Sequence, residues 1–285
     1  MRPPATFALE AKEGIKMSFN EPKTLGRTGL KVGRLGVASS YGAPAEAYEE
    51  AVDRGVNYFY WGAIRRGGMR KAICNIVSRG KRDALVIVLQ SYSRSAGLME
   101  MFLQKGLKAL GIDHADVLLL GWHNKAPWPR IMEKALALRE KGMFRFLAVS
   151  GHNRKLFSLL AGDARFDIFH LRYNAVHRGA EEEVFAKIRP ENRPGLVSFT
   201  ATRWGDLLNT KKMPPGEIPP RAADCYRFVM NHPMVDVCMA GPKNLEEMRE
   251  ALAALQLGPL SEEEMARMQR IGDYIHSHHK HPFAR

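Results

Sequence analysis

The stretch Leu85–Leu120, LVIVLQSYSRSAGLMEMFLQKGLKALGIDHADVLLL, decides the fold of this chain. It opens with an apolar run of strand length, Leu85–Gln90, and continues with an amphipathic segment of helical period over Leu98–Leu110. A second apolar run, Val117–Leu120, ends it. Strands that are separated by helix-length segments are typical of parallel sheets, because a parallel connection must cross back over the sheet. The unit therefore predicts parallel strands covered by helices.

The same alternation extends over most of the chain. Further strand-length runs lie at Leu35–Ser39, Val56–Tyr60, Arg145–Ser150, Ile168–Tyr173, Leu196–Thr200 and Val235–Met239. Helix-length segments lie at Ala45–Arg54, Met69–Ser78, Trp128–Glu140, Arg154–Leu160, Ala180–Ile188, Ala222–Asn231 and Leu245–Leu255. Eight strands, each followed by a helix, is the count of a (β/α)8 barrel, whose usual length of about 250 residues suits this chain. A doubly wound sheet would use fewer strands, and no GxGxxG follows the first one.

Two additions flank the predicted barrel. Thr24–Ser40 is typical of a β-hairpin that runs into the first strand. Glu262–Ile275 predicts a further helix, because Ser261 is an N-cap residue and Glu264 follows it at capping-box spacing. We therefore expect an α/β fold, a (β/α)8 TIM barrel with an N-terminal β-hairpin and an added C-terminal helix, as a single domain over residues 23–275.

The two ends of the sequence differ from this pattern. Residues 1–22 contain three prolines and no clean period, so we expect a disordered leader. Met17 is an alternative start to Met1, because the codons of Lys12–Gly14 would suit a purine-rich ribosome-binding stretch. Residues 276–285 form a His-rich tail that would bind divalent metal only adventitiously. We therefore predict no metal site.

Composition limits the function classes. The chain has 285 residues, 43 Lys or Arg and 30 Asp or Glu, so its formal net charge is +13. Hydrophobic residues make up 45%, which excludes disorder as the dominant state. No apolar run approaches the roughly 20 residues of a membrane span, and three scattered cysteines favour the reducing cytoplasm. The basic residues are scattered, which disfavours a nucleic-acid partner and leaves it as the weakest hypothesis; the sequence does not indicate an oligomeric state.

Four segments together resemble the aldo-keto reductase family. They are LGRTGLKVGRLGVAS (Leu25–Ser39), AVDRGVNYF (Ala51–Phe59), RYNAVHRGAEEEVF (Arg172–Phe185) and RFVMNHPMVDVCMAGPKNLEEMREAL (Arg227–Leu252). The match covers about residues 24–256, in order and with family-like spacing. The resemblance implies a (β/α)8 barrel that reduces carbonyl compounds with NADPH and without a metal.

The resemblance also implies a catalytic Asp, Tyr, Lys and His, and this chain has none of the four. Tyr60 stands at the Asp position, Arg65 at the Tyr position, Gln90 at the Lys position and Gly121 at the His position. Losing the Lys alone would leave a buried carboxylate unpaired, and losing the Asp alone would strand an ammonium. Because both positions now hold neutral residues, we interpret the site as remodelled, a degenerate active site that still folds.

Tyr60, Gln90 and His123 are the candidate catalytic residues of the remodelled pocket. Tyr60, or its neighbour Tyr58, could donate a proton, and a bulge at the strand end could bring His123 into the pocket. A Tyr near its reference pKa of about 10 is a poor acid in this role. The alternative is that both tyrosines are half-buried barrel aromatics and His123 is a loop residue.

The cofactor positions implied by the resemblance are kept in part. Ser150 matches the family, Gly151 replaces an Asn and His170 replaces a Gln at the nicotinamide amide. Asn153 lies close enough to substitute for the lost Asn, and Phe199 can stack on the nicotinamide ring. Lys243 and Arg249 are the candidate partners of a 2′-phosphate, so NADP or NAD is the predicted cofactor.

Arg65 and Arg66, with Arg70 nearby, follow the second strand at the predicted mouth, where they would attract an anionic small-molecule ligand or simply be solvated. Two functions stay open. The first is an aldo-keto-reductase-like, NAD(P)-linked oxidoreductase with a remodelled site and impaired classical carbonyl reduction. The second is a non-catalytic relative, a pseudoenzyme, that binds a nucleotide or an anionic metabolite at the barrel mouth.

Overall fold

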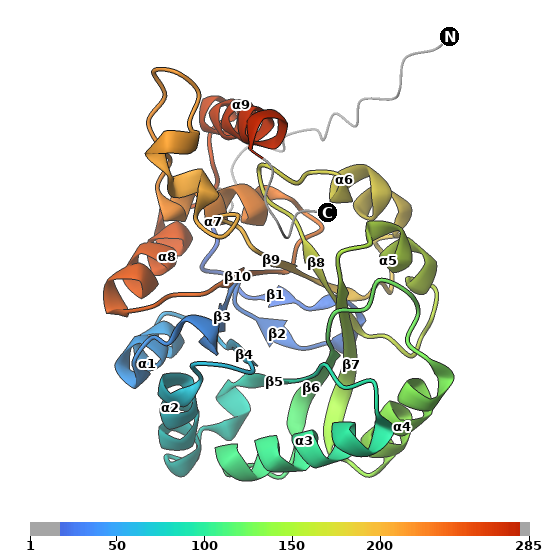
Figure 1. The fold of residues 1–285 in the computed structure, drawn as a ribbon. Coiled ribbons are helices and arrows are strands. Elements are labelled where there is room, and N and C mark those ends of the chain that lie inside the picture. The colour runs from blue at the N-terminus through green and yellow to red at the C-terminus, as the bar shows by residue number, and fades with distance from the viewer. Residues whose placement is uncertain (1–17, 280–285) are drawn as a thin grey trace.

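Eight parallel strands close into a barrel in the computed structural model, which describes residues 18–279 (Figure 1). In chain order they are β3 (Leu35–Ala38), β4 (Tyr58–Trp61), β5 (Val86–Ser91), β6 (Ala115–Leu120), β7 (Phe144–Gly151), β8 (Ile168–Arg172), β9 (Gly195–Phe199) and β10 (Val237–Ala240). Each strand pairs with the next, and β10 pairs with β3, with Cys238 opposite Leu35. The predicted (β/α)8 barrel is confirmed.

A ring of helices surrounds the barrel (Figure 1). The helices are α1 (Ala45–Asp53), α2 (Gly67–Ser78), α3 (Ala96–Leu110), α4 (Pro129–Glu140), α5 (Arg154–Leu160), α6 (Ala180–Glu183), α7 (Ala222–Asn231), α8 (Leu245–Leu257) and α9 (Glu262–His278). Short 3-10 helices lie at Gly26–Thr28, Ser39–Tyr41, Arg82–Ala84, Phe185–Lys187, Asp206–Leu208 and Thr210–Lys212. α9 is the added helix; Ser261 and Glu264 form its capping box as expected.

The N-terminal hairpin closes one end of the barrel. β1 (Lys23–Thr24) and β2 (Lys31–Val32) pair antiparallel. Leu25 and Val32 are fully buried and pack with the side chains that point into the barrel, such as Val117. Because Asn57, just before β4, hydrogen-bonds to the hairpin through Lys31 O, the closed end is the one where the strands begin. The opposite end, where the strands finish, is therefore the end at which a site can form.

Buried aspartates tie the strands together at the closed end. The carboxylates of Asp116, Asp167 and Asp236 accept the backbone N–H of Ile87 (2.8 Å), Leu147 (2.9 Å) and Leu196 (2.9 Å). Each carboxylate also pairs with an arginine: Arg82, Arg139 and Arg193, respectively. Each aspartate thus hydrogen-bonds to a neighbouring strand, and its charge is neutralised by the arginine. These contacts hold the strands together and leave no group for a ligand to bind.

Most predicted strand and helix bounds lie within two residues of the observed ones, and three differences are larger. The expected helix over Ala180–Ile188 is wrong in its second half, because the backbone leaves the helical region at Val184 (φ −126°, ψ −62°). α9 continues three residues beyond Ile275. Phe19 is buried beneath the guanidinium of Arg34, 5.2 Å from its ring centroid, so packing begins before residue 23. The proposed start at Met17 and most of the predicted leader and tail lie outside the described residues.

Candidate functional site

Two of the predicted catalytic residues meet at the carboxyl ends of β4 and β5. The Tyr60 hydroxyl donates a hydrogen bond to Gln90 Oε1, and it lies 3.1 Å from the hydroxyl of Tyr92. Tyr92, two residues beyond Gln90, was not among the predicted site residues. Its side chain is half exposed while Tyr60 is largely covered, so Tyr92 is the member of this group that a ligand at the mouth can reach.

Tyr92 also occupies the space of a family catalytic side chain. A Cβ added at Gly121 would lie 2.2 Å from Tyr92 Cε1. Gly121 is the position at which the resemblance implies a His, so the ring covers the point from which that His would project. The Tyr92 ring can lie here only because residue 121 has no side chain. No pattern in the sequence links the two residues.

The Tyr60–Gln90–Tyr92 group carries no formal charge. Burial raises the pKa of Tyr60 well above its usual value of 10, and the neighbouring Tyr92 adds to the shift. A phenol is made acidic by a nearby cation, and the residue at the Lys position is the neutral Gln90. The group therefore donates hydrogen bonds as a neutral phenol and is a weak acid at pH 7.

His170 lies deeper in the barrel and is bound to Tyr58. Its Nε2 is 2.7 Å from the Tyr58 hydroxyl, and both side chains are buried. Burial lowers the pKa of His170 to about 3 and raises that of Tyr58 well above 10. His170 is therefore neutral, and one ring nitrogen is already engaged, which leaves little of it for the nicotinamide amide that the resemblance assigned to this position.

The low pKa of His170 predicts acid sensitivity. The unfolded chain binds a proton to this ring below about pH 6.5 while the folded chain does not until about pH 3, so stability falls as the pH drops through that window. Between pH 6.5 and 5 the loss is about 2 kcal/mol for this one residue. In His170→Gln the fall in unfolding free energy between pH 7 and 5, measured by urea denaturation, is expected to shrink by about that amount. An unchanged fall, equal to that of the exposed-site control His278→Gln, would contradict the assignment.

His123 lies beside the end of β7 rather than in the tyrosine group. Its backbone N–H donates to Ser150 O at 2.7 Å, and its ring is buried with no hydrogen-bond partner for Nε2 within residues 18–279. Burial lowers the pKa of His123 to about 4, and the nearby Arg94 contributes. A neutral imidazole of this pKa is a poor proton donor at pH 7.

Three residues at the end of β7 are engaged by the loop between β6 and α4. Ser150 Oγ accepts the N–H of Trp122 (3.1 Å), and Asn153 Nδ2 donates to Asn124 O (3.0 Å). A Cβ at Gly151 would lie 1.9 Å from His123 O, so the family Asn cannot fit here without moving that loop. Ser150 keeps its own proton to donate, whereas the Asn153 side chain is tied to the loop.

Aromatic rings line the mouth next to these residues. The ring of His152 packs edge-on against Phe199 (centroids 5.7 Å apart) and against Trp122 (6.1 Å). Trp122 is 59% exposed and has a positive φ of 58°, a conformation that costs energy in a non-glycine residue. The three rings form an aromatic surface on which a flat ligand ring could stack, and Phe199 is the ring that the sequence predicted for this role.

The predicted 2′-phosphate residues point to other partners. Lys243 precedes α8, and its Nζ lies 3.6 Å from Glu247 in the first turn of that helix. Arg249 pairs with Glu50 of α1 (2.9 Å). At Gly241 the resemblance implies a lysine, but a Cβ there would lie 2.4 Å from the ring of Tyr41, which covers this position. The structure therefore does not bring Lys243 and Arg249 together as a phosphate site.

The arginines after β4 divide into two kinds. Arg66 stacks on Trp61, with its guanidinium carbon 4.0 Å from the ring centroid, and Arg70 Nε donates to Ala109 O of α3 (2.9 Å). Arg65 is exposed and makes no ion pair or hydrogen bond to another described residue. Of the three, Arg65 is the one available to a ligand.

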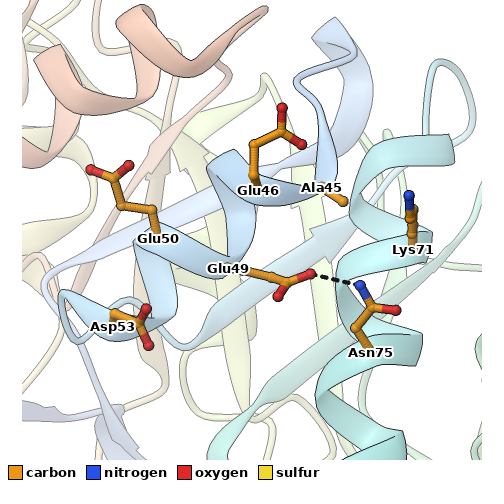
Figure 2. Close-up of a pocket in the computed structure, with 7 residues that line it drawn as sticks. All are labelled: Ala45, Glu46, Glu49, Glu50, Asp53, Lys71 and Asn75. Atoms are coloured by element: carbon orange, nitrogen blue, oxygen red, sulfur yellow. Dashed lines mark hydrogen bonds between the residues drawn. The ribbon is translucent and has the colours of Figure 1, made fainter.

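A groove lies on the outer surface between α1 and α2 (Figure 2). It has a volume of about 460 Å³ and is lined by Ala45, Glu46, Glu49, Glu50, Asp53, Lys71 and Asn75. Glu49 accepts a hydrogen bond from Asn75 (2.7 Å) and pairs with Arg79, so its charge is already compensated. Over residues 18–279 no group of His, Cys, Asp or Glu side chains is arranged to hold a metal ion.

The described helices also bear on the membrane question. None of those between residues 18 and 279 has the length and apolar character needed to cross a bilayer.

Comparison with known proteins gives a likeness in fold. No protein-family model matches the sequence, and no curated protein matches it. An aldo-keto reductase of Bacillus halodurans, AKR11C1, is similar in its apo and holo structures at 16% identity (TM-score 0.69, 88% of this chain, 95% and 96% of that one). An aldo/keto reductase of Klebsiella pneumoniae, in complex with NADP and acetate, is 18% identical (TM-score 0.68, 89% of this chain, 96% of that one). This chain therefore has the fold of these aldo-keto reductases.

Proposed function

We propose that the chain is an aldo-keto-reductase-like oxidoreductase that binds NAD(P)H at the barrel mouth and whose classical carbonyl reduction is weak. The observation that carries the proposal is the Tyr60–Gln90–Tyr92 group, which puts phenol hydroxyls at the strand ends where the resemblance implies catalytic residues. The related fold in which NADP is bound, that of the Klebsiella protein, supports the choice of cofactor.

The residues at the cofactor positions can contact a nicotinamide ring, but fewer of them are available to bind its amide group. Phe199 offers a ring face beside His152, and the Ser150 hydroxyl has a proton to donate. Asn153 and His170 are engaged with Asn124 and Tyr58 and would contribute little. When bound, the cofactor would supply a hydride. In this proposal Phe199 and Ser150 hold the ring at the mouth.

The tyrosines would orient a carbonyl oxygen and deliver its proton. Tyr92 is half exposed, so a proton that it gives can be replaced from solvent, and its hydroxyl lies 3.1 Å from that of Tyr60, which holds it in place. Both steps use neutral phenols. Because burial raises the pKa of Tyr60 and no cation offsets the shift, proton delivery is slow and limits the rate.

Ligand binding and turnover test this proposal. NADPH titration followed by its fluorescence should show saturable binding, and aldehydes or quinones should then be reduced slowly. Tyr60→Phe combined with Tyr92→Phe should lower kcat by about tenfold with little change in NADPH affinity, because the hydroxyls act on the carbonyl and not on the cofactor. Tyr274→Phe on α9 is the matched control.

Two results would overturn the tyrosine assignment or the proposal itself. Turnover that is unaffected by the double variant, with His123→Ala added, would remove Tyr60, Tyr92 and His123 as the candidate acids. Absence of NADPH binding at millimolar concentration would remove the cofactor.

The second candidate function is a pseudoenzyme that binds a nucleotide or an anionic metabolite without reducing it. It is favoured by the residues already engaged elsewhere, His170 with Tyr58, Asn153 with Asn124 and Arg249 with Glu50. The same experiment separates the two functions, since saturable binding without turnover of any carbonyl supports the pseudoenzyme.

A further inference from the structure

A group of buried basic side chains lies where β8 and β9 end. Arg172 is the last residue of β8, His177 follows in the next loop, and Arg203 lies in the loop after β9. All three side chains are more than nine-tenths buried. We propose that His177 and Arg203, with Arg172 beside them, form a binding site for an oxyanion, the phosphoryl or carboxylate group of a small molecule. The site deepens the proposed ligand binding at the mouth but does not depend on hydride transfer.

The guanidinium of Arg203 has more hydrogen-bond donors than the described residues around it have acceptors. Its NH2 donates to His279 O (2.6 Å) and its NH1 lies 3.3 Å from Asp206 Oδ2, too poorly aligned for a hydrogen bond. Nε has no hydrogen-bond partner within residues 18–279. Asp206 also pairs with Lys212 (2.6 Å), so two cations share this carboxylate. A guanidinium that is 1% exposed and incompletely bonded is costly unless a further acceptor completes it.

The loop that carries Arg203 is held in an unfavourable conformation. Thr200, Arg203 and Trp204 have φ angles of 62°, 51° and 55°, all in the left-handed region that non-glycine residues avoid. Strain of this kind gathers at ligand sites, where the surrounding structure imposes it. The loop follows directly on Phe199 at the end of β9, so Arg203 belongs to the end of the barrel at which the strands finish.

His177 lies close enough to Arg172 and Arg203 for their charges to act on its ring. Asn174 Oδ1 accepts the backbone N–H of His177 (2.9 Å) and so fixes its turn, and the ring of His276 packs edge-on at 5.8 Å. Nε2 is buried and has no hydrogen-bond partner among residues 18–279. The side chain is thus held in position while its polar atom is left unused, as in a preformed binding site.

The charges around His177 select a negatively charged ligand. Burial lowers its pKa to about 3, and Arg172, Arg203, His276 and Arg154 lower it further in that order, which shows that cations dominate its surroundings. Arg154 is offset by Glu183 (2.6 Å). An oxyanion would accept hydrogen bonds from Arg203 and His177 and reduce the repulsion between the buried cations.

Calorimetric titration of the full-length protein with inorganic pyrophosphate and with acetate, at constant ionic strength in chloride, tests the site. At least one should bind saturably. Arg203→Met should weaken that binding by about tenfold or more, because a charge-assisted hydrogen bond is lost, and His177→Leu should weaken it to a smaller extent. Arg165→Met, an exposed arginine paired with Asp163 before β8, is the matched control and should bind as the wild type does.

Arg203→Lys keeps the charge without the planar fork and guards against a folding defect in Arg203→Met; its affinity should be intermediate. Pyrophosphate that competes with NADPH would identify the site with the phosphates of a dinucleotide, and acetate that binds alongside NADPH would identify it with the acid group of a substrate. The inference is overturned if neither anion binds saturably, or if the affinity is the same in all the folded variants. Neither result decides the proposed function, because that proposal is tested separately by carbonyl turnover.

Discussion

Asp236→Ala is expected to lower the free energy of unfolding by about 3–5 kcal/mol, because it leaves a buried guanidinium without its carboxylate. Asp236 is fully buried at the closed end of the barrel. Its two oxygens accept bonds from Arg193 NH1 (2.7 Å) and NH2 (2.6 Å), and Oδ2 also accepts the backbone N–H of Leu196 (2.9 Å). The substitution removes all three bonds, and the Arg193 side chain, which is 10% exposed, can regain few of them from water.

Chemical denaturation at pH 7 measures this effect, and two variants sharpen it. Asp273→Ala removes an exposed carboxylate that pairs with Arg178, and it should cost no more than about 1 kcal/mol. Replacing both partners, Asp236→Leu with Arg193→Met, should recover part of the loss, because the guanidinium is removed together with its carboxylate. The recovery is partial because Lys23, 3.4 Å from Asp236, still loses its carboxylate. A loss below about 1 kcal/mol for Asp236→Ala would show that this end of the barrel does not depend on the ion pair.

The same aspartates show where sequence reasoning stops for the fold. The apolar run Leu85–Gln90 predicted β5 to within one residue at each end, because burial on both faces makes a strand of a parallel barrel hydrophobic throughout. Asp236, by contrast, interrupts the run Val235–Met239 and gives no sign of its role. Its partners Arg193 and Leu196 are about 40 residues away, and only closure of the barrel brings them together.

At the site, strand-end positions could be predicted and side-chain neighbours could not. Tyr60 and Gln90 were expected at the ends of adjacent strands, and there they meet. Tyr92 over Gly121 and Tyr41 over Gly241 are contacts between loops, which a pattern within one segment does not contain. Arg249 faces Glu50 on another helix for the same reason: its partner is fixed by helix packing.

Reinstating the family residues is expected to raise NADPH-dependent carbonyl reduction by about 100-fold or more, the contribution of a positioned acid. The changes are Tyr60→Asp, Arg65→Tyr, Gln90→Lys and Gly121→His, with Tyr92→Ala. The new Lys and Asp must enter together, since either charge alone would be buried without a partner. Beside that Lys, the pKa of the new Tyr would fall towards working pH.

Tyr92→Ala is required by the geometry and provides the decisive control. A side chain at position 121 would begin 2.2 Å from the Tyr92 ring, so the four-residue variant that keeps Tyr92 must displace either this ring or the new His. It should therefore gain far less activity than the five-residue variant, as followed by NADPH absorbance with an aldehyde. A folded five-residue variant that binds NADPH but reduces nothing would mean that the missing acid does not explain weak turnover. The cause would then lie in the loop at position 65, where φ is 47° and a new Tyr would have to adopt a left-handed backbone to reach the carbonyl.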